Sequence, residues 1–237
     1  MPDQGAVSDG IAALHHAVIN CQRCPRLVAH RSQVASTKKP AYQDQPYWGR
    51  PVPGWGDLQA RLLVLGLAPG AHGANRTGLP FSGDSSGNIL LPALKRAGFA
   101  SLKLRSTNHR IHPTDYQLQD AYLTNVVRCA PPANLPEAQE RDNCQPFLAA
   151  EIHLLGNLQV ILALGGYAYT AGLLALQRLG IDPPRPRPGF SHSLNLKLPP
   201  YVLICSYHPS RRNTQTGLLT VEMLDAILQT CKSLLKE

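Results

Sequence analysis

The stretch LLVLGLAPGAHGANRTGLPFSGDSSG, residues 62–87, joins a short apolar run to a loop rich in glycine. The apolar run is typical of a buried strand. Six glycines from Gly66 to Gly87 let the backbone approach a flat ligand closely and turn its N–H groups toward it. Phe81 and Asp84 add an aromatic ring and a carboxylate to the same loop. The combination predicts a pocket at a strand end that suits a nucleobase better than a phosphate.

This loop lacks the two common nucleotide-binding patterns. After Gly73 and Gly78 the chain continues with Leu79 and Pro80 instead of Lys and Ser or Thr, so the loop is not a P-loop. It does not contain GxGxxG either. Enzymes that bind nucleoside triphosphates or dinucleotides are therefore disfavoured.

The rest of the chain alternates between strand and helix patterns. Short apolar runs predict strands at 62–67, 122–128, 160–164 and 201–207. Helical spacing predicts helices at 9–20, 87–97, 144–155, 167–179 and 220–235, with Pro92 as a candidate kink in the second. The alternation predicts an α/β fold, a three-layer α/β/α sandwich with a central four-stranded parallel sheet. We expect one domain over residues 1–237, with an ordered loop at 38–57 and a surface connection at 183–193.

Three polar loops follow predicted strands. They are the glycine-rich loop, RCAPPANLP at 128–136 and HPSRRNTQTG at 208–217. Ligands of open parallel sheets bind beyond the carboxyl ends of the strands, so we expect these loops to meet around one site. His208 begins the last loop, and Arg211 and Arg212 have the chemistry to contact phosphates and base edges. A solvated loop before a helix is the alternative.

The charge balance favours a polyanionic partner. The 237 residues include 23 Lys and Arg against 15 Asp and Glu, a formal net charge of +8. The basic residues are scattered, so this signal alone does not separate nucleic-acid binding from other functions. No apolar stretch approaches the roughly 18 to 20 residues that span a bilayer, and the N-terminus lacks a secretion signal. We therefore expect a cytoplasmic protein without membrane contact.

Four of the six cysteines form a candidate metal site. The helix predicted at 9–20 leads into Cys21 and Cys24, a C-x-x-C pair, while Cys129 and Cys144 are widely spaced. Four thiolates fit either zinc or a 4Fe-4S cluster. The wide second pair is unlike a zinc ribbon and favours the cluster, with four unrelated buried cysteines as the remaining alternative. Cys205 and Cys231 fall inside a strand and a helix pattern, and we expect them in the core.

These motifs together resemble the family five uracil-DNA glycosylases, the iron–sulfur branch of that superfamily in bacteria and archaea. The resemblance runs from about Cys21 to the C-terminal helix. It rests on segment 66–84, the order of the four cysteines, NVVRCAPPANLP at 125–136 and SYHPSRRNTQTG at 206–217. It implies an α/β/α sandwich with a four-stranded parallel sheet and a structural 4Fe-4S cluster held by Cys21, Cys24, Cys129 and Cys144.

The resemblance also implies roles for single residues. Phe81 matches the aromatic residue that stacks on the extruded base, and Asp84 the carboxylate that positions the attacking water. Asn134 matches an amide that lines the base pocket. His208 matches the histidine that contacts the base and its developing negative charge. The segment 210–217 matches the part that enters the DNA, where we expect contacts from Ser210, Arg211, Arg212, Asn213 and Gln215.

Two positions depart from relatives. Other branches of the superfamily place a carboxylate or an amide in the first motif, where this chain has Leu67 and Ala68. Catalysis should therefore depend more on stabilising the leaving base and the sugar cation than on forcing water in as a strong nucleophile. Asn125 occupies the position of a uracil-reading Asn in the related family four. It either reads the base here or only completes a strand end.

We therefore predict a monofunctional DNA glycosylase of base-excision repair, active as a monomer on DNA in the nucleoid. Uracil is the main expected substrate, with hypoxanthine, xanthine and other lesions as candidates. Amides of Gly66, Ala68 and Gly70 would help to bind the base. The competing predictions are a metal-stapled nucleic-acid-binding module without catalytic activity and an iron–sulfur redox protein. The first leaves the grouping of Phe81, Asp84 and His208 unexplained, and the second lacks any sign of a flavin or a second cluster.

Overall fold

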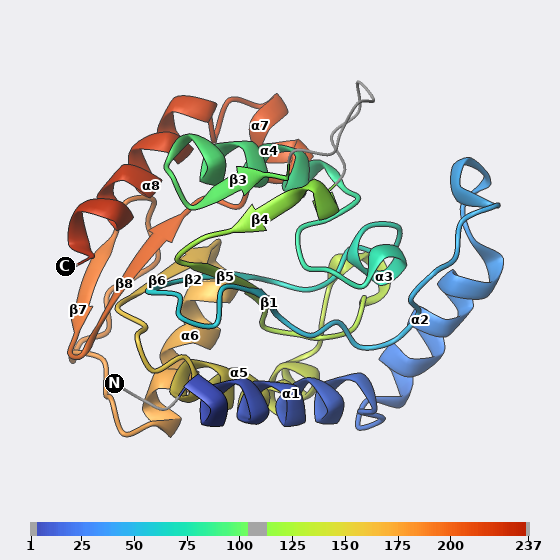
Figure 1. Ribbon diagram of the computed structural model, residues 1–237, viewed down its shortest axis with the longest axis horizontal. Helices are drawn as coiled ribbons and strands as arrows, with labels where there is room; N and C mark the ends of the chain where they lie inside the picture. Colours follow the sequence, from blue (N-terminus) through green and yellow to red (C-terminus); the bar gives the residue numbers. More distant parts are fainter. Residues whose placement is uncertain (1–3, 104–112, 236–237) are drawn as a thin grey trace.

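The computed structural model describes residues 4–103 and 113–235. It contains a central sheet with helices on both faces, as Figure 1 shows. Helices α1 (Gln4–Ile19), α5 (Ala138–Leu154) and α6 (Gly166–Arg178) cover one face, and α4 (Ser85–Arg96) and α8 (Val221–Leu234) cover the other. The predicted three-layer α/β/α sandwich is confirmed.

The sheet has six strands in the order β1-β5-β2-β6-β8-β7. Its centre is formed by β5 (Ala121–Asn125), β2 (Leu62–Gly66), β6 (Val160–Leu164) and β8 (Tyr201–Ser206), which are parallel to one another. These are the four strands that the sequence predicts. Two short antiparallel strands, β1 (Trp55–Gly56) and β7 (Asn195–Leu198), extend the sheet at its edges. The four parallel strands all end at the same edge, which is where the polar loops begin.

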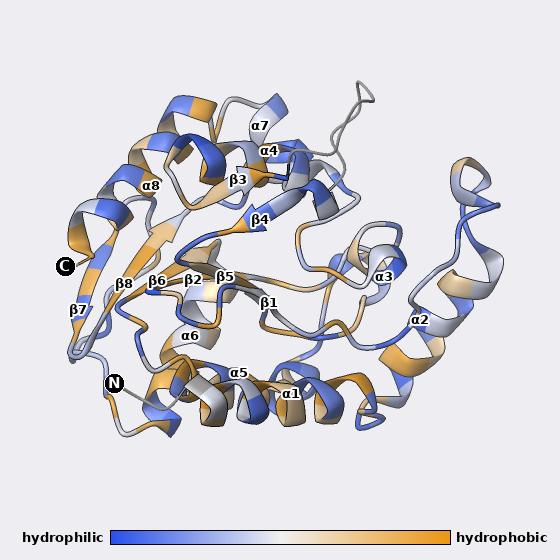
Figure 2. Cartoon of the chain, viewed as in Figure 1, coloured by the Kyte–Doolittle hydropathy of each residue, from blue (hydrophilic) through white to orange (hydrophobic). Residues whose placement is uncertain are grey.

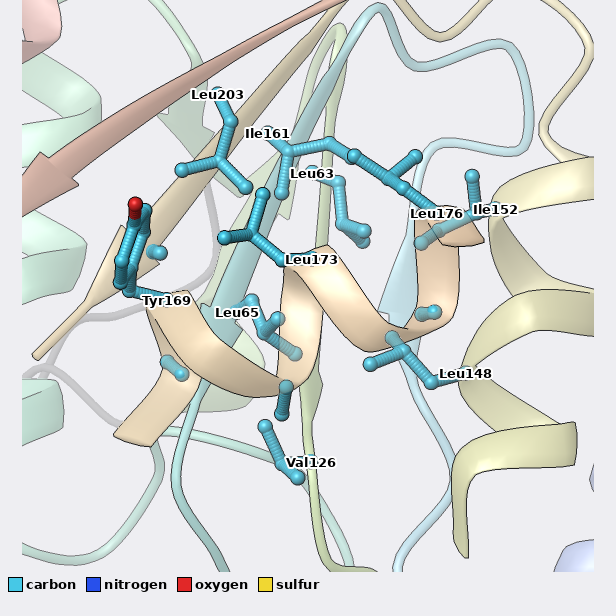
Figure 3. Packing of buried hydrophobic residues seen from close by; sticks show 14 of the residues in the cluster. Leu63, Leu65, Val126, Leu148, Ile152, Ile161, Tyr169, Leu173, Leu176 and Leu203 are labelled. Atoms are coloured by element: carbon cyan, nitrogen blue, oxygen red, sulfur yellow. The ribbon is translucent and has the colours of Figure 1, made fainter. Parts of the chain in front are cut away.

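The central strands are apolar because both of their faces are buried. Every residue of β2, β5 and β6 is buried, and their side chains alternate between the two helical layers. Figure 2 shows the hydrophobic residues concentrated in these strands. On the α6 face, Leu173 lies near Leu65 and Leu203, and Leu148 of α5 closes the same cluster (Figure 3).

Smaller elements complete the chain. Helix α2 (Pro25–Thr37) extends away from the sheet in Figure 1, and the antiparallel pair β3 (Ala100–Leu102) and β4 (Tyr116–Leu118) lies beside α4. The short helical turns are η1 (Pro40–Tyr42), α3 (Ala74–Thr77), η2 (Pro113–Asp115), η3 (Pro132–Asn134) and α7 (Arg211–Gln215). Among the described residues no helix is long and apolar enough to cross a membrane.

Several predicted boundaries were wrong. The helix predicted at 144–155 begins at Ala138, where Glu137 and Glu140 form a capping box, and it continues through Pro146. The strand predicted at 122–128 ends at Asn125, although Val126 and Val127 still donate backbone hydrogen bonds toward β2. Helix α4 likewise continues through Pro92. The expected connection at 183–193 contains no helix or strand.

Candidate active site

A cleft of about 770 Å³ opens at the carboxyl ends of the central strands. Its walls come from the glycine-rich loop after β2, the end of β5, the η3 turn and the segment after β8. It therefore brings together the three loops that the sequence places at one edge. Among the predicted residues, the cleft is lined by Ala68, Gly70, Phe81, Asp84, Asn125, Asn134, His208, Ser210, Arg211 and Arg212.

Phe81 lines the cleft, and two glycines leave room for its ring and its carbonyl group. It is buried and has a left-handed backbone with φ of 55°. A side chain on Gly87 would clash with the Phe81 carbonyl group, and a Cβ on Gly66 would lie 2.5 Å from Phe81 Cζ. Gly66 does not itself line the cleft within the described residues; its missing side chain leaves the space that the ring uses. Gly66 and Gly87 thus leave the space that the Phe81 ring and its carbonyl group use.

Asp84 is both the N-cap of α4 and the acid of the cleft. Its Oδ1 accepts a hydrogen bond of 3.0 Å from the Gly87 N–H. Its Oδ2 lies toward Gly70 and Gly73, where an added Cβ would fall 3.0 Å and 2.6 Å from that oxygen. Burial raises the pKa of Asp84, and hydrogen bonds from the backbone of Gly87 and Ser86 oppose this shift. The carboxylate therefore presents Oδ2 on the side of the cleft that Gly70 and Gly73 form.

His208 lies two residues after the end of β8 and lines the cleft. Its carbonyl oxygen accepts hydrogen bonds from the Asn213 side chain at 2.9 Å and from the Ser210 N–H at 2.7 Å. Burial lowers the pKa of His208 to about 4. The imidazole is therefore neutral near pH 7, with one nitrogen that donates and one that accepts.

Two asparagines face the cleft from neighbouring segments. Asn125 is the last residue of β5 and is 3% exposed, and its amide makes no hydrogen bond within the described residues. Asn134 ends the η3 turn, where Ala133 and Asn134 both have left-handed backbones with φ of 53° and 58°. Both amides are placed where a ligand's polar edge could be read.

The segment after His208 is a short helix and not the loop that the sequence predicts. Ser210 is the N-cap of α7, its Oγ accepting from the Asn213 N–H at 3.3 Å. Arg211 and Arg212 are exposed at the cleft, and neither has an acidic partner in the part of the chain that the structure describes. The two arginines give this wall of the cleft a net positive charge.

Two residues of this segment do not line the cleft. The Asn213 amide is used in the hydrogen bond to the His208 carbonyl group. Gln215 is exposed at the end of α7. Asn213 therefore holds the backbone of His208 in place, and DNA contact by Asn213 or Gln215 stays a prediction.

One wall of the cleft contains residues that the sequence motifs did not predict. Lys39, Tyr42 and His72 also line it. The Tyr42 ring lies under the Arg76 guanidinium at 4.0 Å, and His72 Nδ1 is hydrogen-bonded to the Tyr47 hydroxyl at 2.9 Å. The aromatic and basic residues of segment 38–57 could have indicated a ligand-binding surface. The segment has no hydrophobic periodicity, however, so its position relative to the sheet could not be predicted.

The four cysteines singled out in the sequence line one small pocket between α2, the loop after β5 and α5. Cys129 and Cys144 are buried, Cys21 and Cys24 are partly buried, and all four are free thiols. Burial raises the pKa of Cys129 to about 12 and that of Cys144 to about 11. Within the described residues, no group of three or more His, Cys, Asp or Glu side chains has a geometry that could hold a metal ion.

Arg31 gives this pocket an unusual charge. Its side chain is 3% exposed, and its Nη1 donates a 3.0 Å hydrogen bond to Cys129 Sγ. Its Nε has no hydrogen-bond partner, and no carboxylate among the described residues pairs with it. The buried guanidinium thus faces four thiols without a compensating negative charge. Cys205 and Cys231, by contrast, are fully buried in the core, which confirms the prediction for them.

Comparison with known proteins gives consistent matches. The family model described as the uracil DNA glycosylase superfamily matches residues 53–232. A Type-5 uracil-DNA glycosylase of Mycobacterium tuberculosis is 45% identical over 232 residues, covering 94% of this chain and 81% of that protein. The Thermus thermophilus Type-5 enzyme is 45% identical over 215 residues, 90% of this chain and 93% of its own. A Type-4 uracil-DNA glycosylase of Pyrobaculum aerophilum is 31% identical over 153 residues, 64% of this chain and 59% of its own.

Proposed function

This chain belongs to the uracil-DNA glycosylase superfamily, in its type-5 branch, and we propose that the cleft described above is where it excises uracil from DNA. The reaction hydrolyses the N-glycosidic bond between the base and deoxyribose and leaves an abasic site. It is the base-removal step of base-excision repair.

The observation that carries the proposal is the convergence of Phe81, Asp84 and His208 in one cleft. The three side chains come from two loops that lie far apart in the sequence, and they offer a stacking surface, an acid and a neutral hydrogen-bond donor. Base excision needs these three functions at one place. A nucleic-acid-binding module without catalytic activity does not require them to meet.

Base recognition begins with extrusion from the stack, which costs a few kcal/mol and least at a mismatch. Phe81 stacks on the extruded base, a contact worth about 1 to 3 kcal/mol. The Asn125 and Asn134 amides lie at the cleft and read the polar edge of the base. The Asn125 amide offers both a donor and an acceptor to the cleft, which suits the donor and acceptor on the polar edge of uracil.

The leaving base becomes negatively charged as the bond breaks. His208 is neutral near pH 7 because burial lowers its pKa, so it donates a hydrogen bond to this charge without giving up a proton. Backbone amides of the loop between Gly66 and Gly70 add further donors. Leu67 and Ala68 line the first part of this loop and supply no carboxylate, so stabilisation of the leaving base is the main catalytic contribution.

Asp84 acts on the other product of bond cleavage, the sugar cation. Its Oδ1 is held by the Gly87 N–H, while Oδ2 is free to orient a water and to offset positive charge on the sugar. The transition state resembles an oxocarbenium ion, as in sugar hydrolysis, with one carboxylate in place of the usual two.

We propose a structural 4Fe-4S cluster held by Cys21, Cys24, Cys129 and Cys144. Four thiols around one pocket are the donor set of such a cluster, and the unpaired charge of Arg31 suits an anionic group beside it. When bound, the cluster supplies a cross-link between α2 and α5. Zinc is the alternative.

The partner is uracil-containing DNA, which binds as a duplex or a single strand. It lies along the wall of the cleft that is formed by Ser210, Arg211 and Arg212. Hypoxanthine and xanthine are further candidate substrates. We propose that the protein acts as a monomer.

The decisive experiment is an abasic-site assay on a duplex with one uracil, compared with the same duplex carrying thymine. We expect strand scission after alkali only with uracil, and the purified protein should retain its metal. If metal-replete protein gives no strand scission, the glycosylase function is excluded, and the nucleic-acid-binding module without catalytic activity is the remaining explanation.

A further inference from the structure

His192 contacts the residue that precedes His208 in the chain. It lies between α6 and β7, and its Nδ1 accepts a 3.2 Å hydrogen bond from the Tyr207 N–H. Burial lowers the pKa of His192, so its ring is neutral near pH 7, with the proton on Nε2. The ring also stacks on the Tyr207 ring, with 5.0 Å between the centroids and 16° between the planes. Among the described residues that line the cleft, His192 is not included. It therefore acts on this stretch from outside the cleft.

The hydrogen bond from Tyr207 is made at the point where β8 ends. Within β8, the Cys205 N–H donates a 2.9 Å hydrogen bond to the Leu194 carbonyl group. The Tyr207 N–H points to the same side two residues later, and its acceptor is the His192 ring in place of a backbone carbonyl group. A backbone N–H that loses its acceptor at a partly buried place is costly. The His192 ring thus fixes the direction in which the chain leaves the sheet.

The segment that carries His192 is itself held in place. The Tyr169 hydroxyl of α6 donates a 2.6 Å hydrogen bond to the Pro188 carbonyl group. Phe190 packs edge-on against the Tyr207 ring, with 6.1 Å between the centroids. The Tyr207 ring therefore contacts two rings of this segment. An acceptor on a fixed segment positions a neighbouring backbone more precisely than an acceptor on a loose loop.

The residues on either side of Tyr207 have other anchors. The Ser206 carbonyl group accepts a 2.8 Å hydrogen bond from the Gly165 N–H. The His208 carbonyl group accepts one of 2.9 Å from the Asn213 side chain. Three consecutive residues are thus held by three different parts of the chain, and His192 supplies the contact in the middle.

We propose that His192 is a positioning residue for base excision, which holds the Tyr207 backbone so that the His208 imidazole meets the leaving base; this rests on the proposed function. A displacement of about 1 Å in a catalytic group can lower a rate by about a hundredfold. His192 can therefore affect bond cleavage without contact to the DNA. We expect it to influence the rate of cleavage and not the affinity for the duplex.

The test replaces His192 with Asn or Leu, which are similar in size but differ in the hydrogen-bond acceptor. The Asn side-chain oxygen can take the place of Nδ1, whereas Leu offers no acceptor. In single-turnover excision at saturating uracil duplex, we expect His192→Leu to be about tenfold slower than the parent protein and His192→Asn to stay within about threefold. The Kd for the duplex should change by less than about twofold in both variants.

His153→Leu is the control for this comparison, because His153 is exposed on α5 and is not among the residues that line the cleft. It should excise uracil at the parent rate. Equal excision rates for His192→Asn and His192→Leu would overturn the proposal, because the acceptor would then make no difference.

A double-mutant cycle tests whether His192 acts through His208. In a His208→Ala background the position of the ring no longer matters, so adding His192→Leu should lower the excision rate by less than about twofold. A purely structural effect of His192→Leu would lower the rate by the same factor in both backgrounds, and that result would contradict the proposal. Circular dichroism checks that each variant is folded at the assay temperature.

A readout without DNA separates this proposal from the proposed function. In NMR spectra of the free protein, the His208 ring signals should shift in His192→Leu and stay near their parent positions in His192→Asn and His153→Leu. If the parent protein does not excise uracil but this pattern remains, the glycosylase function fails and the positioning of His208 by His192 stands. If the parent excises uracil and the His208 signals are the same in all variants, His192 does not position the ring.

Discussion

Gly66 and Asn125 lie opposite each other in the parallel register of β2 and β5, and a Cβ added to Gly66 would fall 2.5 Å from Asn125 Oδ1. The same Cβ would fall 2.5 Å from Phe81 Cζ. Phe81 and Asn125, the two side chains proposed to contact the base, therefore both approach the same glycine at the end of a buried strand. The glycine is required by this close approach, because its backbone φ is not in the left-handed region.

The first prediction follows from that contact. Gly66→Ala should lower the excision rate on uracil DNA by about tenfold or more, because the added methyl group displaces the Phe81 ring or the Asn125 amide. The free energy of unfolding should fall by about 1 to 3 kcal/mol, as for other overpacked sites. Single-turnover kinetics and urea denaturation measure the two effects. Gly189→Ala is the control, since its Cβ would meet no atom within 4 Å; equal rates for the two variants would contradict the contact.

Asp84 allows its structural and catalytic roles to be separated. Asn is as good an N-cap as Asp, so Asp84→Asn should keep α4 stable while the excision rate falls by about a hundredfold. Asp84→Ala should lose the rate and also about 1 kcal/mol of stability, because the Gly87 N–H loses its acceptor. An excision rate of Asp84→Asn equal to that of the parent would show that the carboxylate is only a cap.

His208 should leave a signature in the pH dependence of stability. Its pKa is about 4 in the folded protein and near 6.5 when exposed, because burial disfavours the charged ring. Between these values the unfolded chain binds a proton that the folded chain does not, so stability falls as the pH is lowered from about 6.5 toward 4. The parent protein should therefore lose more stability than His208→Asn between pH 7 and pH 5 in urea titrations. Parallel losses would mean that the ring is solvated.

The buried parallel core could be predicted from sequence, and the elements around it could not. VILAL at 160–164 coincides with β6, because a short run of only apolar residues is typical of a strand that is buried on both faces. Helix α2 was missed because its buried side chains are only Leu27 and Arg31, which form no apolar stripe. Strand β7 was missed because four residues, NLKL, are too few to establish an alternation.

The site follows the same division. Phe81 and Asp84 belong to the loop that follows one predicted strand, and His208 begins the loop after another, so the topology predicts that they meet at one edge. Lys39 and Tyr42 were missed because they lie in the segment 38–57, whose path over the cleft depends on tertiary contacts such as Arg76 over Tyr42. The meeting of Gly66 and Asn125 depends on the register of two strands, which no local pattern encodes.

The cysteine pocket gives a prediction about metal. Cys129→Ser should lose iron and the broad absorbance near roughly 400 nm expected of a thiolate-bound cluster, and it should unfold at lower temperature because metal binding is coupled to folding. Cys205→Ser changes a fully buried cysteine of the core that lies outside the cysteine pocket, and this variant should keep its iron. Metal analysis, visible spectra and thermal unfolding of both variants test this. One zinc per chain and a colourless parent protein would support the zinc alternative.

The basic wall of the cleft can be tested through salt dependence. Arg211 and Arg212 are exposed and lack acidic partners in the described part of the chain, so each is free to displace a counterion from a DNA phosphate. Each change to Ala should weaken DNA binding and reduce the slope of log K against log salt by about 1. Lys197→Ala is the control, because Lys197 is exposed on the edge strand β7 and does not line the cleft. If only the arginine variants reduce the salt slope, the DNA runs along this wall. If Lys197→Ala reduces the slope by the same amount, the salt dependence of DNA binding reflects only the net charge of the protein.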